Sequence, residues 1–229
     1  MNIAGLQKMT LLDFPGKVAC TVFLAGCNFR CPFCHNFEIV QGAARPLMDE
    51  AALLAFLTRR RGLLDGVCIS GGEPLLSAGL PELLRAAKGL GFAIKLDTNG
   101  TSPDALAALL GEGLVDYVAM DFKNSPDRYA RTAGVGAVDL GAVRRTAAMI
   151  LGGAVDGEFR TTVVAGLHDE AAIRAIAAEI KGARRYFLQP FVDRDTVPAR
   201  GLQAPDEDAM RRLLAAARET IPTAEIRGE

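Results

Sequence analysis

Short hydrophobic runs alternate along the chain with longer stretches in which apolar residues recur at helical spacing. Gly, Pro, Asp or Asn closes each short run, and this pattern is typical of buried strands in a parallel sheet. The predicted strands are Ala19–Leu24, Gly66–Ser70, Ala93–Asp97, Tyr117–Phe122, Phe159–Val164 and Tyr186–Pro190. We expect residues Ile3–Thr10 to add a flanking strand before the first of them.

The longer stretches are rich in Ala, Leu and Arg, which favour helices. They are Asp49–Arg61, Leu80–Leu90, Pro103–Leu110, Leu140–Leu151, Asp169–Ile180 and Asp206–Glu219. A series of six strand-then-helix units predicts an α/β fold with parallel strands joined by right-handed crossovers. Six units are too few for an eight-stranded barrel, so an open partial barrel and a doubly wound sheet both remain. In either fold the active site belongs at the carboxyl ends of the strands.

Composition and charge narrow the class of protein. Half of the residues are hydrophobic and the formal net charge is −1, so the chain is expected to fold as a soluble globule without a nucleic-acid footprint. No stretch resembles a signal peptide or is apolar enough to span a bilayer, which predicts a cytoplasmic protein without a membrane partner. No shift in composition marks a boundary, so we expect one domain over residues 1–229.

Three of the five cysteines lie within eight residues, in a segment that directly follows the first predicted strand of the series. Cys27, Cys31 and Cys34 have C-x3-C-x2-C spacing, which lets three thiolates surround one iron–sulfur cube. Thiolate is the soft ligand that such clusters prefer. Three ligands leave one iron open, as a catalytic metal centre requires. The triad therefore predicts a catalytic cluster.

Other interpretations of these cysteines are weaker. A structural zinc site would need His35 as its fourth ligand, but His35 adjoins Cys34 and no second C-x2-C pair follows. An electron carrier usually closes its cluster with four cysteines. Cys20 and Cys68 fall inside predicted strands, where free cysteine is usually part of the core.

Polar residues follow the next predicted strands. Gly71-Gly72 lets another group approach the backbone closely, and Glu73 can pair with a cationic amine, although a Gly-Gly pair alone is an ordinary turn. Asp97 and Asp121 end neighbouring strands beside Lys123, so two carboxylates fall in one layer and would repel an anionic ligand unless a cation intervenes. The structural alternative is that Asp97 caps a helix and Asp121 pairs with Lys123.

The triad, with Phe33 before its last cysteine, resembles the signature of the radical S-adenosylmethionine (SAM) superfamily. His35-Asn36 and the earlier segment Leu12–Lys17 resemble the glycyl-radical-enzyme activating enzymes, especially those that activate anaerobic ribonucleotide reductase. The resemblance covers almost the whole chain. It implies a partial (βα)6 barrel, with parallel strands and outer helices, that holds a [4Fe–4S] cluster and SAM.

The resemblance also implies roles for individual residues. Cys27, Cys31 and Cys34 would hold the cluster and serve catalysis, and Asp97 with Asp121 would bind a monovalent cation. The residues implied in SAM binding are Phe33, Gly71, Gly72, Glu73, Asp97, Asn99, Lys123 and Val164. Asp169 stands where the family usually has glutamate and is expected to cap a helix. His168 is assigned either to the loop surface or to a function.

The function implied is reductive cleavage of SAM to form a glycyl radical on a partner enzyme, with anaerobic ribonucleotide reductase as the expected partner. Flavodoxin or ferredoxin would donate the electron. No cysteine follows Cys68, which excludes a second cluster held by cysteines in this chain. Two alternatives stay open. One is a radical SAM enzyme that modifies a small molecule or peptide, and the other is a non-catalytic iron–sulfur or zinc module.

Overall fold

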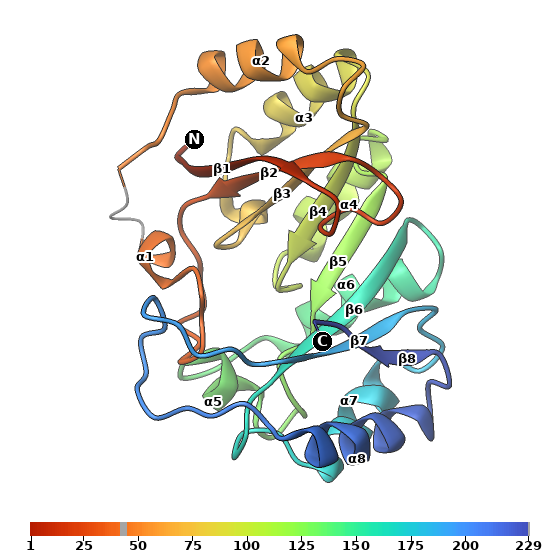
Figure 1. Ribbon diagram of the computed structural model, residues 1–229. Helices are drawn as coiled ribbons and strands as arrows, with labels where there is room; N and C mark the ends of the chain where they lie inside the picture. Colours follow the sequence, from red (N-terminus) through yellow and green to blue (C-terminus); the bar gives the residue numbers. More distant parts are fainter. Residues whose placement is uncertain (42–44, 229) are drawn as a thin grey trace. The chain divides into compact units, whose positions relative to one another are not determined.

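A computed structural model describes residues 1–41 and 45–228 of the chain (Figure 1). Every predicted strand and helix is present, and most bounds agree to within one or two residues. The strands are β1 (Ile3–Thr10), β2 (Ala19–Leu24), β3 (Gly66–Gly71), β4 (Ala93–Thr98), β5 (Tyr117–Asp121), β6 (Asp156–Val163), β7 (Tyr186–Pro190) and β8 (Ala224–Ile226). The helices are α1 (Phe37–Val40), α2 (Glu50–Arg59), α3 (Leu80–Gly89), α4 (Pro103–Gly111), α5 (Tyr129–Ala133), α6 (Leu140–Leu151), α7 (Glu170–Glu179) and α8 (Glu207–Arg218), with a 3-10 turn, η1 (Pro74–Leu76).

The strands follow one another in the sheet in chain order, from β1 to β8. β1 pairs with β2 in the antiparallel sense, whereas the pairs β2–β3, β3–β4, β6–β7 and β7–β8 are parallel. The order has β1 at one end and β8 at the other, so the sheet is not closed. The predicted α/β class with parallel strands is therefore confirmed.

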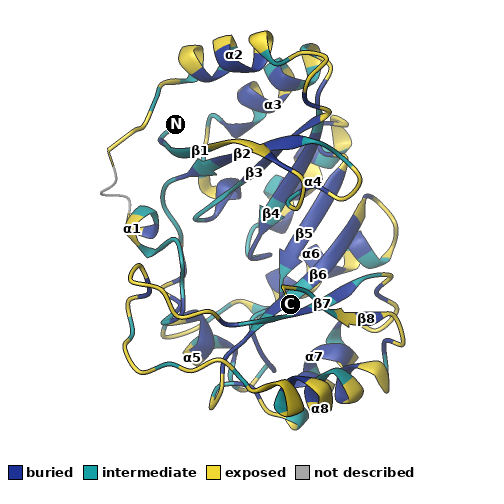
Figure 2. Ribbon diagram, viewed as in Figure 1, coloured by how far each residue is buried: buried dark blue, intermediate teal, exposed yellow. Residues whose placement is uncertain are grey.

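Contacts divide the chain into two compact units. The first unit comprises residues 1–28, 38–98 and 104–118, and it contains the strands β1 to β4. In β2 and β3 the side chains are mostly buried on both faces, as in a sheet covered by helices (Figure 2). Helices α2, α3 and α4 belong to this unit, and the side chain of Asp49 caps the first turn of α2.

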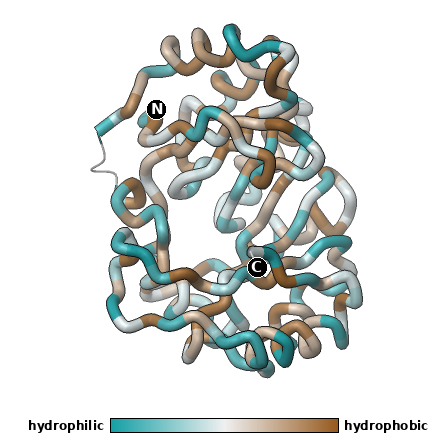
Figure 3. Tube along the Cα trace, in the orientation of Figure 1, coloured by the Kyte–Doolittle hydropathy of each residue, from teal (hydrophilic) through white to brown (hydrophobic). Residues whose placement is uncertain are grey.

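The second unit comprises residues 29–37, 99–103 and 119–229, and its last residue lies outside the described part of the chain. It contains β6 to β8 with helices α5 to α8. Hydrophilic and hydrophobic residues alternate along α7 and α8, as expected of helices with one face in the core (Figure 3). Asp169 caps α7 by accepting a hydrogen bond from the Ala172 N–H, which confirms the capping role predicted for it.

In the described part of the chain, four elements were not predicted from the sequence: the short helices α1 and α5, the 3-10 turn η1 and the three-residue strand β8. The absence of a membrane-spanning helix was expected, and none of the helices in the described part of the chain is long and apolar enough to cross a bilayer.

Candidate active site

The cysteine segment is shared between the two units. Cys27 follows β2 in the first unit and is partly exposed, whereas Cys31 and Cys34 belong to the second unit. All five cysteines are free thiols. Cys20 and Cys68 lie fully buried in β2 and β3, which confirms them as core residues. Burial also raises the pKa of the Cys20 thiol to about 11, so that this cysteine stays protonated and unreactive.

In the second unit, backbone contacts hold the loop that carries Cys31 and Cys34. The Arg30 N–H donates to the Ala133 carbonyl at the end of α5 over 2.8 Å, and the Ala199 N–H donates to the Pro32 carbonyl over 3.1 Å. Phe33 is buried, and burial raises the pKa of the Cys34 thiol. The loop is therefore anchored on both sides of Cys31 by parts of the chain that are distant in sequence.

His35 makes two further contacts within this unit. Its ring stacks on Phe191, with centroids 5.7 Å apart and planes 6° from parallel, and its Nε2 lies 2.6 Å from the Val192 carbonyl oxygen. One ring nitrogen of His35 therefore has a protein partner and needs no metal ion. The two contacts also connect the cysteine loop to the segment that follows β7.

The donor set of this segment fits an iron–sulfur cluster with three protein ligands. Its three free thiols are soft donors, and the neighbouring imidazole is engaged by a backbone carbonyl. Among the residues that the structure describes, no three His, Cys, Asp or Glu side chains are gathered as a ready-made metal site. The assignment of the three cysteines to the cluster thus remains a prediction that rests on their spacing and chemistry.

In the first unit, the Gly-Gly-Glu motif contacts the backbone that precedes Cys27. The Gly72 N–H donates to the Leu24 carbonyl over 2.9 Å, and the Glu73 N–H donates to the Gly26 carbonyl over 2.8 Å. A Cβ at Gly72 would collide with the same Gly26 carbonyl. The second glycine is therefore required for close approach of two loops, a role that the sequence analysis had assigned to ligand approach.

Glu73 itself is 1% exposed. Its Oε1 accepts a hydrogen bond from the Leu75 N–H, which caps η1, and another from the Thr98 hydroxyl at the end of β4. Glu73 thus connects the ends of β3 and β4 in addition to any role toward a ligand.

Asp97 lies at the end of β4 and contacts Lys95 and Ser70 in the first unit. It forms an ion pair with Lys95 and accepts a hydrogen bond of 2.9 Å from the Ser70 hydroxyl. Lys95 is almost completely buried, and its ammonium also lies 3.7 Å from the Cys68 sulfur. Sequence reasoning overlooked Lys95, although its position two residues before Asp97 on the same strand face was a signal.

In the second unit, Asp121 is paired with two cations. Lys123 donates to one of its oxygens over 3.0 Å, and Arg160 donates to the other over 2.9 Å. Burial raises the pKa of the Asp121 carboxyl, but the charges of Arg160 and Lys123 outweigh burial and hold that pKa well below its usual range. Burial likewise disfavours the charged form of Lys123, and the attraction of Asp121 outweighs it and raises the Lys123 pKa. The Asp121–Lys123 pair that the sequence analysis kept as a structural alternative is present.

The carboxylates predicted to bind a monovalent cation therefore do not fit that role well. Asp97 in one unit and Asp121 in the other each already have a cationic side chain as partner. Asn99 accepts hydrogen bonds from the backbone and hydroxyl of Thr101, and so forms the turn that its Asn-Gly sequence favours.

His168 is buried and joins two loops of the second unit. Its Nδ1 accepts a hydrogen bond from the Val164 N–H, so its Nε2 carries the proton and donates to the Lys123 carbonyl over 2.9 Å. Burial lowers the pKa of the imidazole, which keeps it neutral. His168 is thus a structural link between two residues, Lys123 and Val164, that the family resemblance assigns to SAM.

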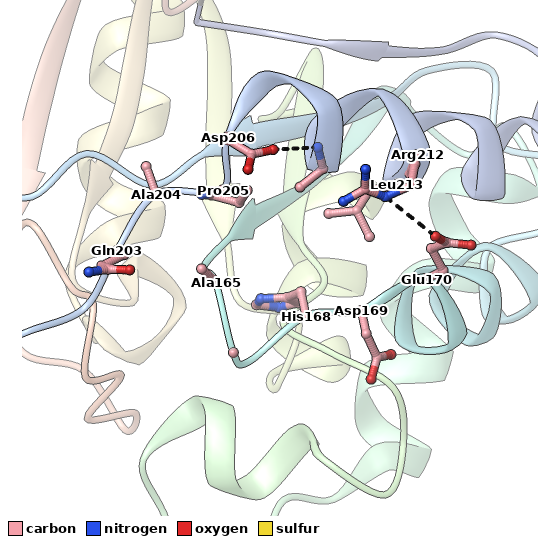
Figure 4. A pocket seen from close by; sticks show the side chains of 12 residues that line it. Ala165, His168, Asp169, Glu170, Gln203, Ala204, Pro205, Asp206, Arg212 and Leu213 are labelled. Atoms are coloured by element: carbon pink, nitrogen blue, oxygen red, sulfur yellow. Dashed lines mark hydrogen bonds and ion pairs between the residues drawn. The ribbon is translucent and has the colours of Figure 1, made fainter.

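A cavity of about 510 Å³ lies beside this link (Figure 4). His168 and Ala165 line one side of it, and Gln203 and Asp206 line another. The Ala165 N–H donates to the Gln203 carbonyl over 3.0 Å, which fixes the segment after β7 against the end of β6. The cavity adjoins Val164, the residue predicted to contact adenine.

Comparisons with known proteins bear on the family. The profile of the radical SAM superfamily matches residues 21–178. A protein of Methanocaldococcus jannaschii, named for an inferred glycyl-radical enzyme activating activity, is 32% identical over 98% of this chain and 95% of its own length. Pyruvate formate-lyase-activating enzyme of Clostridium pasteurianum is 32% identical over 55% of this chain and 54% of its own.

A solved structure supports the fold. A domain of pyruvate-formate lyase-activating enzyme from Bacteroides vulgatus superposes with a TM-score of 0.58 at 17% identity, over 71% of this chain and all but 1% of that domain. The signature cysteines, the parallel α/β sheet and a profile match over more than half of the sequence agree. The chain belongs to the radical SAM superfamily of enzymes.

Proposed function

We propose that the chain is an activating enzyme that cleaves SAM reductively and generates a glycyl radical on a partner enzyme. The observation that carries this proposal is the cysteine segment, with three free thiols at radical SAM spacing in a chain that resembles an activating enzyme over almost its full length. Cys27, Cys31 and Cys34 would hold a [4Fe–4S] cluster. The proposal treats residues 1–229 as one functional radical SAM domain.

When bound and reduced, the cluster supplies the electron that splits SAM into methionine and a 5′-deoxyadenosyl radical. The protein's own residues bind and orient SAM. The Lys123 ammonium suits the SAM carboxylate, the Glu73 carboxylate suits its amine, and the buried Val164 suits the adenine ring. Gly71, Gly72, Asn99 and Phe33 would shape the surrounding backbone.

The proposed partner is anaerobic ribonucleotide reductase, and the proposed electron donor is a flavodoxin or ferredoxin. The partner follows from the resemblance of His35-Asn36 and Leu12–Lys17 to activating enzymes of that kind, and the electron donor follows from the need of the cluster for one electron. The relative from Methanocaldococcus jannaschii supports a glycyl-radical enzyme as the class of partner.

The test begins with protein purified without oxygen and reconstituted with iron and sulfide. Dithionite and SAM are added, and 5′-deoxyadenosine is measured together with the electron paramagnetic resonance spectrum of the added reductase. A glycine-centred doublet supports activation, whereas 5′-deoxyadenosine without a doublet for any glycyl-radical enzyme of the host would favour a small-molecule or peptide substrate. If neither 5′-deoxyadenosine nor the doublet forms although the cluster is complete and SAM is bound, the proposal is refuted.

The Cys31→Ala variant provides the matched control for the cluster. Two remaining thiolates hold the cube poorly, so both iron content and SAM cleavage are expected to be lost. Cys68→Ala serves as the comparison, because Cys68 lies in the core of β3 and its replacement should leave the iron content unchanged. Full iron and full cleavage in Cys31→Ala would overturn the assignment of the triad.

A further inference from the structure

Four side chains of the first unit meet on one face of two neighbouring strands. Cys68 of β3 lies opposite Lys95 of β4 in the parallel register, and Ser70 and Asp97 each lie two residues further along their strands. Because side chains alternate between the faces of a strand, all four point to the same side. Lys95 pairs with Asp97 and approaches Cys68, while Ser70 donates to Asp97.

The two charged side chains of this cluster are buried and compensate each other's charge. Only 2% of the Lys95 side chain and 16% of the Asp97 side chain are exposed. A buried ammonium is unfavourable unless a carboxylate compensates its charge, and the same holds for a buried carboxylate. Each group is therefore the counter-ion of the other, and the Ser70 hydroxyl supplies a further bond to Asp97.

A sodium or potassium ion at Asp97 would have to compete with this ammonium. Both ions bind to oxygen atoms, and a carboxylate whose charge is already compensated by a nearby ammonium attracts a further cation less strongly. Lys95 supplies the positive charge that such an ion would bring to Asp97, and it is covalently attached and cannot dissociate. In the second unit, Asp121 is likewise matched by Lys123 and Arg160.

We propose that Lys95 replaces a monovalent cation at Asp97, so that the protein folds and binds SAM without sodium or potassium. The inference concerns the SAM-binding half of the proposed function and not the identity of the partner enzyme. Lys95 is a positioning residue in this proposal, because it acts on Asp97 and touches no reacting atom.

The first test uses the protein without iron or SAM. Its thermal unfolding is followed in sodium, potassium and tetramethylammonium chloride at equal ionic strength. The wild type is expected to unfold at the same temperature in all three salts. A saturable rise in the midpoint of about 2–4 °C or more in sodium or potassium would show that the native protein binds one of these ions and would overturn the proposal.

The Lys95→Met variant provides the complementary measurement. It removes the charge and is one atom shorter than lysine. Asp97 should now recruit an ion, so the variant should unfold at a higher temperature in sodium or potassium than in tetramethylammonium. Lys88→Met is the matched control, since Lys88 pairs with Asp116 on the surface of the same unit and its loss should create no ion preference. A Lys95→Met variant that folds and shows no preference contradicts the proposal.

If Lys95→Met does not fold, the double variant Lys95→Met/Asp97→Asn decides. It removes both charges and should recover the fold, because neither group is then left uncompensated in the core. Failure of the double variant to recover would assign Lys95 a packing role and refute its role as counter-ion.

The final measurement is SAM affinity of the reconstituted wild type by calorimetry. The dissociation constant in tetramethylammonium is expected to be within about twofold of that in potassium, and a loss of about tenfold or more would overturn the proposal. Because the unfolding measurements need neither cluster nor SAM, they remain decisive for Lys95 even if the chain fails to cleave SAM.

Discussion

Replacement of Gly134 by alanine tests how the loop that carries Cys31 is held. Gly134 ends α5 with a φ of +69°, and its N–H donates to Arg131 while the next N–H donates to Ala130, which is the Schellman pattern. A Cβ at this position would collide with the Arg30 carbonyl oxygen and would lie 3.2 Å from the Cys31 nitrogen. The substitution should therefore push the cysteine loop away from α5.

The chain contains a matched control for this change. Gly153 ends α6 in the same pattern, with a φ of +75°, but a Cβ there would meet nothing within 4 Å. Gly153→Ala should cost only the backbone strain, about 1–2 kcal/mol for a left-handed alanine, reduced by the lower entropy of the unfolded chain. A net loss of about 1 kcal/mol in the free energy of unfolding follows.

Gly134→Ala carries the same strain and an additional loss. To relieve the collision, the Arg30 N–H must give up its 2.8 Å hydrogen bond to Ala133, which contributes about 0.5–1.5 kcal/mol. The total is about 1.5–2.5 kcal/mol. For a chain of this size, each kcal/mol corresponds to about 2–4 °C in the unfolding midpoint, so Gly134→Ala should unfold about 3–10 °C below the wild type.

Thermal unfolding of the protein without its cluster measures the loss of stability, and the iron bound after reconstitution measures the displacement of the cysteine loop. Gly153→Ala should keep the full iron content, whereas Gly134→Ala should lose most of it because Cys31 is displaced. The reasoning is refuted if the two variants unfold at the same temperature and bind the same amount of iron.

Three further predictions concern residues outside this loop. In the folded protein without its cluster, a maleimide at pH 8 should label the partly exposed Cys27 and Cys34 but neither Cys20 nor Cys68, which are fully buried and should react only after unfolding; mass spectrometry of the labelled peptides decides. Burial lowers the His168 pKa below its usual 6.5, so protons bind more readily to the unfolded chain than to the folded one. The free energy of unfolding, measured with urea, should therefore fall as the pH drops below about 6.5. In His168→Gln this fall with pH should be smaller. Arg227→Ala removes the bidentate partner of the buried Glu158. The free energy of unfolding in urea should fall by about 2–4 kcal/mol, less than for a fully buried pair because a third of the arginine is exposed. Adding Glu158→Gln should restore part of this loss.

The strand pattern of this chain could be predicted because its parallel strands are short, buried and closed by turn residues. Ala19–Leu24 and Tyr186–Pro190 agree with β2 and β7 at both ends. β8 could not be predicted in this way, because a three-residue run contains no periodicity. It is a strand because it pairs with β7 and because Arg227, just beyond it, forms an ion pair with Glu158 and stacks on Phe187.

The chemistry of the candidate site was predicted from motifs, whereas the partners of its charged residues were not. Asp97 and Asp121 were recognised as carboxylates at strand ends, but Lys95 and Arg160 were overlooked. Both cations lie inside strands, where a sequence shows only an isolated charge in an apolar run. Which carboxylate such a charge meets depends on strand register and side-chain length, and neither can be obtained from local pattern. The same limit applies to His168, whose two partners lie four and 45 residues away.

Another set of contacts holds the predicted cofactor residues in place through their backbone groups. The Glu73 N–H bonds to Gly26 beside Cys27, Ala133 and Ala199 bond to the loop of Cys31, and His168 bonds to the backbone of Lys123. A hydrogen bond to a backbone group fixes the position of the Cα atom of a residue without using the functional atoms of its side chain. Each of these bonds joins two protein groups, so it restricts its loop and reduces the conformational entropy that binding of the cluster and SAM must remove. Substitutions at the residues that make these contacts should therefore weaken cofactor binding even where they touch no ligand.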